Sequence, residues 1–75
     1  MKLGKVTGRI PLAKPAEELL GAQILQVELE GSSLAALDRA GAKPGDRVLV
    51  VMNRAAGMYS RETPADAVVV AVVES

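Results

Sequence analysis

Residues 25–30 alternate strictly between apolar and polar side chains. Leu25, Val27 and Leu29 occupy every second position, and polar residues lie between them. A period of two is typical of a β-strand. A strand with one apolar and one polar face is typical of an antiparallel sheet whose second face meets water. The pattern therefore predicts a strand with one buried side.

Residues 47–52 and 66–73 are apolar on both faces, and both favour strands. One apolar face can fill the interior of a small barrel. A chain of 75 residues is too short to cover the other face with a layer of helices. We expect a neighbouring copy of the chain to cover that face. The alternative is that helical turns at 16–20 and 54–58 cover it.

The segment 2–12 also favours a strand, because β-branched residues recur in it. Leu3 is out of phase with the apolar residue at Ile10, which predicts a bulge or bend near Gly4. Gly8 offers a second bending point. A curved strand with glycines is what a small barrel requires.

Two short connections carry recognisable turn chemistry. Residues 15–21 begin with a proline, continue with acidic residues and end with a glycine, which predicts one helical turn. The segment from Lys43 to Asp46 reads Lys-Pro-Gly-Asp, with Gly45 at the position that needs a positive φ in a type II turn.

Residues 33–41 have the local signals of a helix. Ser33 is a good helix cap, Leu34 and Leu37 have helical spacing, and Gly41 is a good helix stop. Local rules alone therefore favour a helix in this segment.

Composition excludes several classes of protein. The chain has no His or Cys, so it can form neither a thiolate or imidazole zinc site nor a Ser-His or Cys-His nucleophile pair. Nine Lys and Arg balance nine Asp and Glu, so no net field draws in nucleic acid or an acidic membrane. We expect no metal, no cofactor, no nucleic acid and no membrane partner.

Targeting signals are not evident. The longest apolar run, residues 67–73, is far shorter than the ~20 residues of a membrane-spanning helix. No apolar stretch of signal-peptide length follows the charged first residues. We therefore expect a cytoplasmic protein.

The apolar residues are small: about a third of them are Ala, and Tyr59 is the single aromatic residue. A core of this size rarely supplies more than ~3–5 kcal/mol. Disulfides and metals are excluded by composition, so self-association is the support that remains.

Residues that could carry chemistry are scattered. The candidates for catalysis are Asp38, Asp46, Asp66, Lys43, Ser60 and Tyr59. None of them is set beside a base, so we predict no catalytic residues and no enzyme activity. The basic residues near the start of the chain are Lys2, Lys5, Arg9 and Lys14. Barrels that bind single-stranded nucleic acid stack bases on several aromatics, so a solvated strand face is the better interpretation of this cluster.

Four segments in order resemble one known family, the pentameric vertex proteins of bacterial microcompartment shells, as in carboxysomes and ethanolamine-utilisation compartments. Residues 1–8 are similar to the first strand of that family, and residues 20–27 to its L-x-G-x-x-L-L-x-V segment. Residues 36–50 are similar to A-x-D-x-x-G-A-x-x-G-D-x-V-L-V, and residues 64–74 to P-x-D-A-x-V-V-A-I-V-D.

The resemblance implies an all-β fold: a small five-stranded barrel of the oligonucleotide/oligosaccharide-binding (OB) type, with one or two short helical turns. Against the local helical signals, it makes 34–38 the short third strand. It implies one vertex-type shell domain over residues 1–75, assembled as a homopentamer that caps shell vertices and contacts hexameric shell proteins. The alternative is a small OB-like barrel that binds nucleic acid or another ligand.

The resemblance also bears on the subunit interface. The family usually carries Gly-Ser-Ala-Ala-Arg after the third apolar strand, and here the matching stretch keeps only the two alanines. The residues expected at the interface are Asn53, Arg54, Ala55, Ala56, Val68, Val69 and Val70. A charge placed on whichever of Val68 or Val69 faces outward is expected to break the ring.

Overall fold

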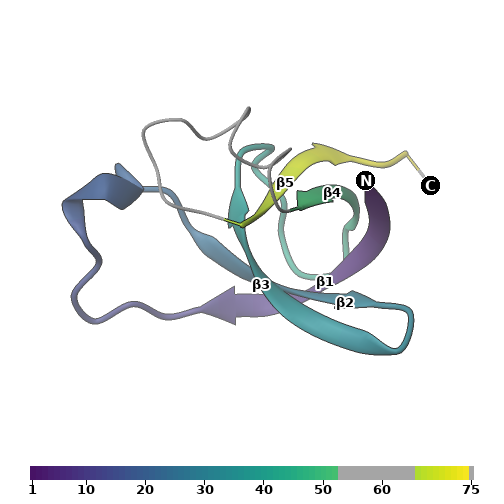
Figure 1. Cartoon of the computed structure of the whole chain (residues 1–75), viewed down its shortest axis with the longest axis horizontal. Helices are drawn as coiled ribbons and strands as arrows, with labels where there is room; N and C mark the ends of the chain where they lie inside the picture. The colour runs from purple at the N-terminus through teal and green to yellow at the C-terminus, as the bar shows by residue number, and fades with distance from the viewer. Residues whose placement is uncertain (53–65, 75) are drawn as a thin grey trace.

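The computed structural model describes residues 1–52 and 66–74. Within these residues the chain forms five strands and one 3-10 turn (Figure 1). The elements in order are β1 (Lys2–Ile10), η1 (Glu17–Leu19), β2 (Ile24–Leu29), β3 (Ser32–Asp38), β4 (Arg47–Met52) and β5 (Ala67–Val72). The predicted strands at 25–30, 47–52 and 66–73 therefore match β2, β4 and β5.

The strands close into a barrel in the order β1-β2-β3-β5-β4. All neighbours are antiparallel except β3 and β5, which run parallel over two residue pairs. The first half of β1 pairs with β4 and its second half pairs with β2, so this long strand links the two sides of the barrel. The expectation of an all-β fold with a five-stranded barrel is confirmed.

Of the two bending points predicted in β1, Gly8 borders the observed register shift and Gly4 does not. The ladder between β1 and β4 runs from Lys2 to Lys5 without a shift, so there is no bulge at Gly4. The register shift falls between Val6 and Gly8, in the ladder with β2. Leu3 is out of phase because its side chain points outward and is 48% exposed. The prediction of a bulge at Gly4 failed because it took Leu3 to lie on the buried face of the strand.

The segment 33–41 contains a strand and no helix, as the family resemblance implied. All six residues of β2 pair with β3, from Ile24 opposite Leu37 to Leu29 opposite Ser32. Ala36 and Leu37 are buried by this pairing. The helical spacing is a local preference that sheet formation overrides, since β3 fills the place in the barrel wall between β2 and β5.

The turns predicted at 15–21 and 43–46 are present. The amide of Asp46 donates to the carbonyl of Lys43 at 3.0 Å, and Gly45 has a φ of 97°. The helical turn expected at 16–20 is η1, which ends at Leu19 and is followed by Leu20 and Gly21 with φ values of 53° and 77°. The turn expected at 54–58 lies outside the described residues.

The barrel interior holds the main core. Its largest fully buried members are β-branched or leucine side chains from four strands. They are Val6, Leu25, Val27, Val48, Val50 and Val69. The three alternating apolar residues of β2 predicted to face inward all belong to this core, with Leu29 at 9% exposure.

Candidate assembly surface

A second apolar cluster lies on the outer side of the barrel wall. It consists of Leu37, Val51 and Val68, each at most 2% exposed. The half-buried residues packed against it are Leu19, Ala22, Ile24 and Val70. Leu19 belongs to η1 and Ala22 follows it, so the chain itself covers this part of the second face of β4 and β5.

The valines expected at a subunit interface, Val68 and Val69, are both 0% exposed within the single chain. Val68 is the one on the outer side of the barrel wall, and its contact with another copy stays a prediction. Val69 lies in the barrel interior and Val68 in the outer cluster. The alternation along β5 correctly predicts that Val68 and Val69 lie on opposite faces of the strand. It does not predict that η1 and Ala22 cover the outer face at Val68. Val70 is half-buried.

The other expected interface residues, Asn53, Arg54, Ala55 and Ala56, lie outside the described residues. The same holds for Tyr59 and Ser60.

An apolar row remains on the outside of β1, β4 and β5. Leu3 is opposite Leu49 in one ladder, and Leu49 is opposite Ala71 in the next. Leu3 is 48% exposed, and the other two are half-buried. Sequence reasoning missed this row, although the odd phase of Leu3 was the signal that could have found it.

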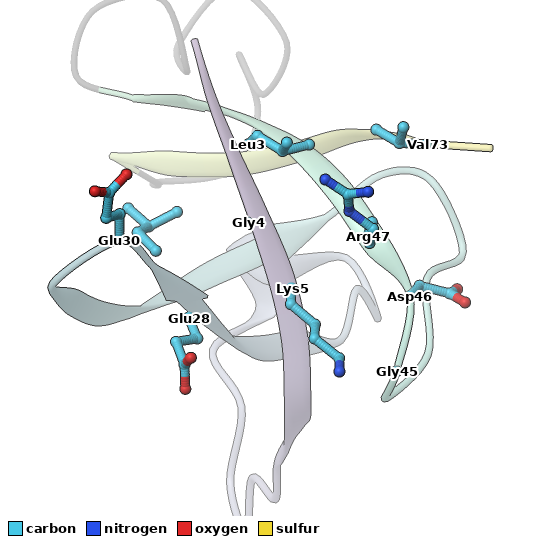
Figure 2. Close-up of a pocket in the computed structure, with 10 residues that line it drawn as sticks. Leu3, Gly4, Lys5, Glu28, Glu30, Gly45, Asp46, Arg47 and Val73 are labelled. Atoms are coloured by element: carbon cyan, nitrogen blue, oxygen red, sulfur yellow. The ribbon is translucent and has the colours of Figure 1, made fainter. Parts of the chain in front are cut away.

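A hollow of about 480 Å³ opens beside this row. We call it the β1 hollow; its lining residues are Leu3, Gly4, Lys5, Glu28, Leu29, Glu30, Gly45, Asp46, Arg47 and Val73. Figure 2 shows Glu28 and Glu30 on the β2 side and Arg47 on the β4 side, with β1 and Lys5 between them. Leu3, Leu29 and Val73 form its apolar part.

A second exposed feature is the segment 11–20 between β1 and β2, which we call the arm. Every residue in it is exposed except the half-buried Leu19. Leu12 and Leu20 are 40% and 58% exposed. Figure 1 shows this segment, drawn in blue, extending away from the barrel on the side opposite to the chain termini. An exposed arm with two leucines is a candidate contact surface.

Asp38 is the one charged residue buried among those described, at 8% exposure. Its carboxylate accepts hydrogen bonds from the side-chain Nε2 of Gln23 at 2.7 Å, from the amide of Ala40 at 3.0 Å and from the amide of Ala42 at 3.1 Å. All three donors are groups of the barrel's own chain: one side-chain amide and two backbone amides. Asp38 therefore holds the chain where it leaves β3.

Among the described residues, the remaining catalytic candidates, Asp46, Asp66 and Lys43, form no common site. Asp46 accepts a hydrogen bond from the amide of Lys43 at 3.1 Å, within its own turn. Asp66 and Lys43 are exposed. In residues 1–52 and 66–74, no group of three or more acidic side chains gathers that could hold a metal ion.

The basic cluster expected to be solvated is exposed: Lys2, Lys5 and Arg9 lie on β1, and Lys14 lies on the arm. A search of the described part of the chain for a helix long and apolar enough to cross a membrane finds none.

Comparison with solved structures shows relatives that match nearly the whole chain. EutN from Escherichia coli, an ethanolamine utilisation protein, is 31% identical over 97% of this chain and 85% of its own, with a TM-score of 0.84. CcmL from Gloeobacter violaceus is 25% identical over 100% of this chain and 87% of its own, with a TM-score of 0.87. The GrpN pentameric microcompartment shell protein from Rhodospirillum rubrum is 30% identical over 100% of this chain and 95% of its own, with a TM-score of 0.83.

No curated protein sequence matches the chain. The profile of the family described as ethanolamine utilisation protein EutN/carboxysome matches residues 1–74. The match spans all five strands of the barrel. The chain therefore belongs to the EutN/CcmL family, as the resemblance of its four segments predicted.

Proposed function

We propose that this chain is a structural shell protein whose homopentamer caps the vertices of a bacterial microcompartment. The observation that carries the proposal is the match of residues 1–74 to one family, together with the likeness of the whole barrel to a relative described as a pentameric microcompartment shell protein. A second relative, MSM0273, is also described as a pentameric shell protein and is 26% identical.

The described surface supports a role in assembly. Leu3, Leu12 and Leu20 are 40–58% exposed, and Met1 and Val72 are further exposed apolar residues of the described part of the chain. A domain of this size gains stability when such side chains are buried between copies.

In the proposed role the chain is not an enzyme. The carboxylates of Asp38 and Asp46 are engaged by backbone amides of their own turns, where they organise the fold. A vertex subunit acts through its shape and its contacts, so residues 1–75 form one shell domain with no cofactor.

Native mass spectrometry of the purified chain tests the proposal. The chain has a mass of 7.8 kDa, and the expected result is a single species with five times that mass. A species with the mass of one chain at every protein concentration would overturn the proposal. That outcome would favour the alternative function, a small OB-like barrel that binds nucleic acid or another ligand.

The proposed partners are hexameric shell proteins of the same compartment. Co-expression of those proteins with and without this chain tests the assignment. Closed particles that contain this chain are expected in the first case and open assemblies in the second. Closed particles that lack the chain in both cases would contradict a vertex role.

A further inference from the structure

We propose that the arm (residues 11–20) of one copy docks into the β1 hollow of the next copy, and that this contact joins the subunits head to tail. The inference rests on the proposed function, because it names the surfaces through which that ring forms. The exposed apolar side chains, the charges and the positions of the two surfaces each support the contact.

The arm and the hollow both present apolar side chains that the chain leaves uncovered. Leu12 and Leu20 on the arm are 40% and 58% exposed, and Leu3 at the hollow is 48% exposed. The hollow has a volume of about 480 Å³, within the range of about 300–1,000 Å³ typical of sites that enclose a ligand. Contact between them would bury leucines from both sides.

The hollow is lined by three acidic residues, Glu28, Glu30 and Asp46, and by two basic ones, Lys5 and Arg47, which could meet acidic groups of a partner. Lys5 and Arg47 are directly opposite each other in the ladder between β1 and β4. Like charges in that position destabilise a sheet, and an acidic group placed over them removes the repulsion. Glu28 lies opposite Lys5 in the other ladder, whereas the residue opposite Arg47 is Lys5 itself.

The arm carries the complementary charges. Glu17 and Glu18 of η1 are exposed, and their negative charges are complementary to the positive charges of Lys5 and Arg47. Lys14, three residues before Glu17 in the arm, is exposed, and its positive charge is complementary to the acidic side of the hollow. That side is formed by Glu28 and Glu30. Opposite charges at both ends of the contact fix the direction in which the arm lies and favour one register.

The positions of the two surfaces fit a ring. Figure 1 shows the arm on one side of the barrel and both chain termini on the other. The hollow lies on the side of the termini, because Leu3 and Val73 line it. Two different surfaces on opposite sides of a subunit make a heterologous contact, which closes into a ring when the rotation between copies allows it. A contact between identical surfaces would stop at two copies.

Native mass spectrometry of single-surface variants tests the contact. The arm variant carries Leu12→Glu and Leu20→Glu, and the hollow variant carries Arg47→Glu. Each is expected to shift the main species from the pentamer to the monomer while its circular dichroism spectrum stays that of the folded barrel. Arg9→Glu changes an exposed cation of β1 outside the hollow, so this control is expected to remain pentameric.

Mixing the two variants distinguishes a head-to-tail contact from any other. An intact arm remains on the hollow variant and an intact hollow on the arm variant, so a 1:1 mixture should form heterodimers but no closed ring. The charge exchange is the second test: Glu17→Lys and Glu18→Lys, added to Arg47→Glu in the same chain, should restore the pentamer.

The possible outcomes separate this contact from the proposed function. If the wild-type chain forms a pentamer and both variants retain it, the arm and the hollow are not the contact, although the chain is still a pentamer. If the wild-type chain is monomeric, the proposed function itself fails. Should Arg47→Glu prevent folding, Leu3→Ser replaces it as the hollow variant, and retention of the pentamer by a folded Leu3→Ser chain overturns the inference.

Discussion

The side-chain amide of Gln23 joins the start of β2 to the turn that follows β3 by donating to the carboxylate of Asp38 at 2.7 Å. The same Nε2 also donates to the carbonyl of Ala42 at 3.0 Å. Asp38 in turn accepts from the amides of Ala40 and Ala42, so two side chains bind three backbone groups of the connection after β3. Hydrogen bonds to a buried ionised group are among the stronger ones in proteins.

Removal of the Asp38 carboxylate should therefore destabilise the barrel. Asp38→Ala leaves the amides of Ala40 and Ala42 and the Gln23 side chain without their acceptor, at an expected cost of about 2–4 kcal/mol in the free energy of unfolding. Urea denaturation followed by circular dichroism measures it. Asp46→Ala is the control, because that half-buried residue accepts one hydrogen bond in a solvated turn and should cost about 1 kcal/mol or less. Equal losses in the two variants would contradict the role given to Asp38.

Gly4 marks a close approach of β1 to β2. A Cβ atom at this position would lie 2.6 Å from Cγ1 of Val27 and 3.0 Å from the carbonyl oxygen of Glu28. Gly4→Ala should lower the free energy of unfolding by about 1–3 kcal/mol, because the backbone of β2 cannot move aside without disturbing the core. Thermal unfolding of the variant checks this.

Gly8 on the same strand provides the matched control for Gly4. A Cβ atom at Gly8 would meet nothing within 4 Å. Gly8→Ala should leave stability unchanged or raise it by up to about 1 kcal/mol, since alanine restricts the unfolded chain. A Gly4→Ala chain as stable as the Gly8→Ala chain would show that the two strands can separate at low cost.

Gly45 is required by the geometry of the turn between β3 and β4. Its φ of 97° is strained for a residue with a side chain, and its amide donates to the carbonyl of Val6 at 2.8 Å. Gly45→Ala should cost about 1–2 kcal/mol, whereas Gly45→Asn should cost less because Asn tolerates positive φ better. Chemical denaturation of both variants measures the difference. A Cβ atom at Gly45 would meet nothing within 4 Å, so equal costs for Asn and Ala would contradict the preference of Asn for this backbone conformation.

Features set by local sequence were predictable. The alternation of Leu25, Val27 and Leu29 predicts the inner face of β2, and the apolar runs predict β4 and β5 within a residue or two. The turn at Gly45 follows from the conformational needs of its residues. Each of these depends on neighbours within a few positions in the chain.

Features set by pairing between distant segments were not predictable from the pattern alone. Residues 33–41 have the spacing of a helix, and only the ladders with β2 and β5 make the segment a strand. The burial of Val68 depends on where η1 packs, which no local pattern reports. The odd phase of Leu3 signals that its side chain lies on the opposite face from Val6, but which face is the outer one follows only from the closed order of the strands.

The outer cluster of Leu37, Val51 and Val68 belongs to the single chain, so it should stabilise the monomer. Val68→Ala removes buried methyl groups from a site that η1 already covers, so it should cost about 1–3 kcal/mol of folding stability. Urea denaturation at a protein concentration where the chain is monomeric measures this loss free of assembly. Val72→Ala is the control, because that side chain is 45% exposed and should change monomer stability by about 0.5 kcal/mol or less. A Val68→Ala chain that is as stable as wild type when monomeric, but assembles more weakly, would place Val68 at a contact between subunits instead.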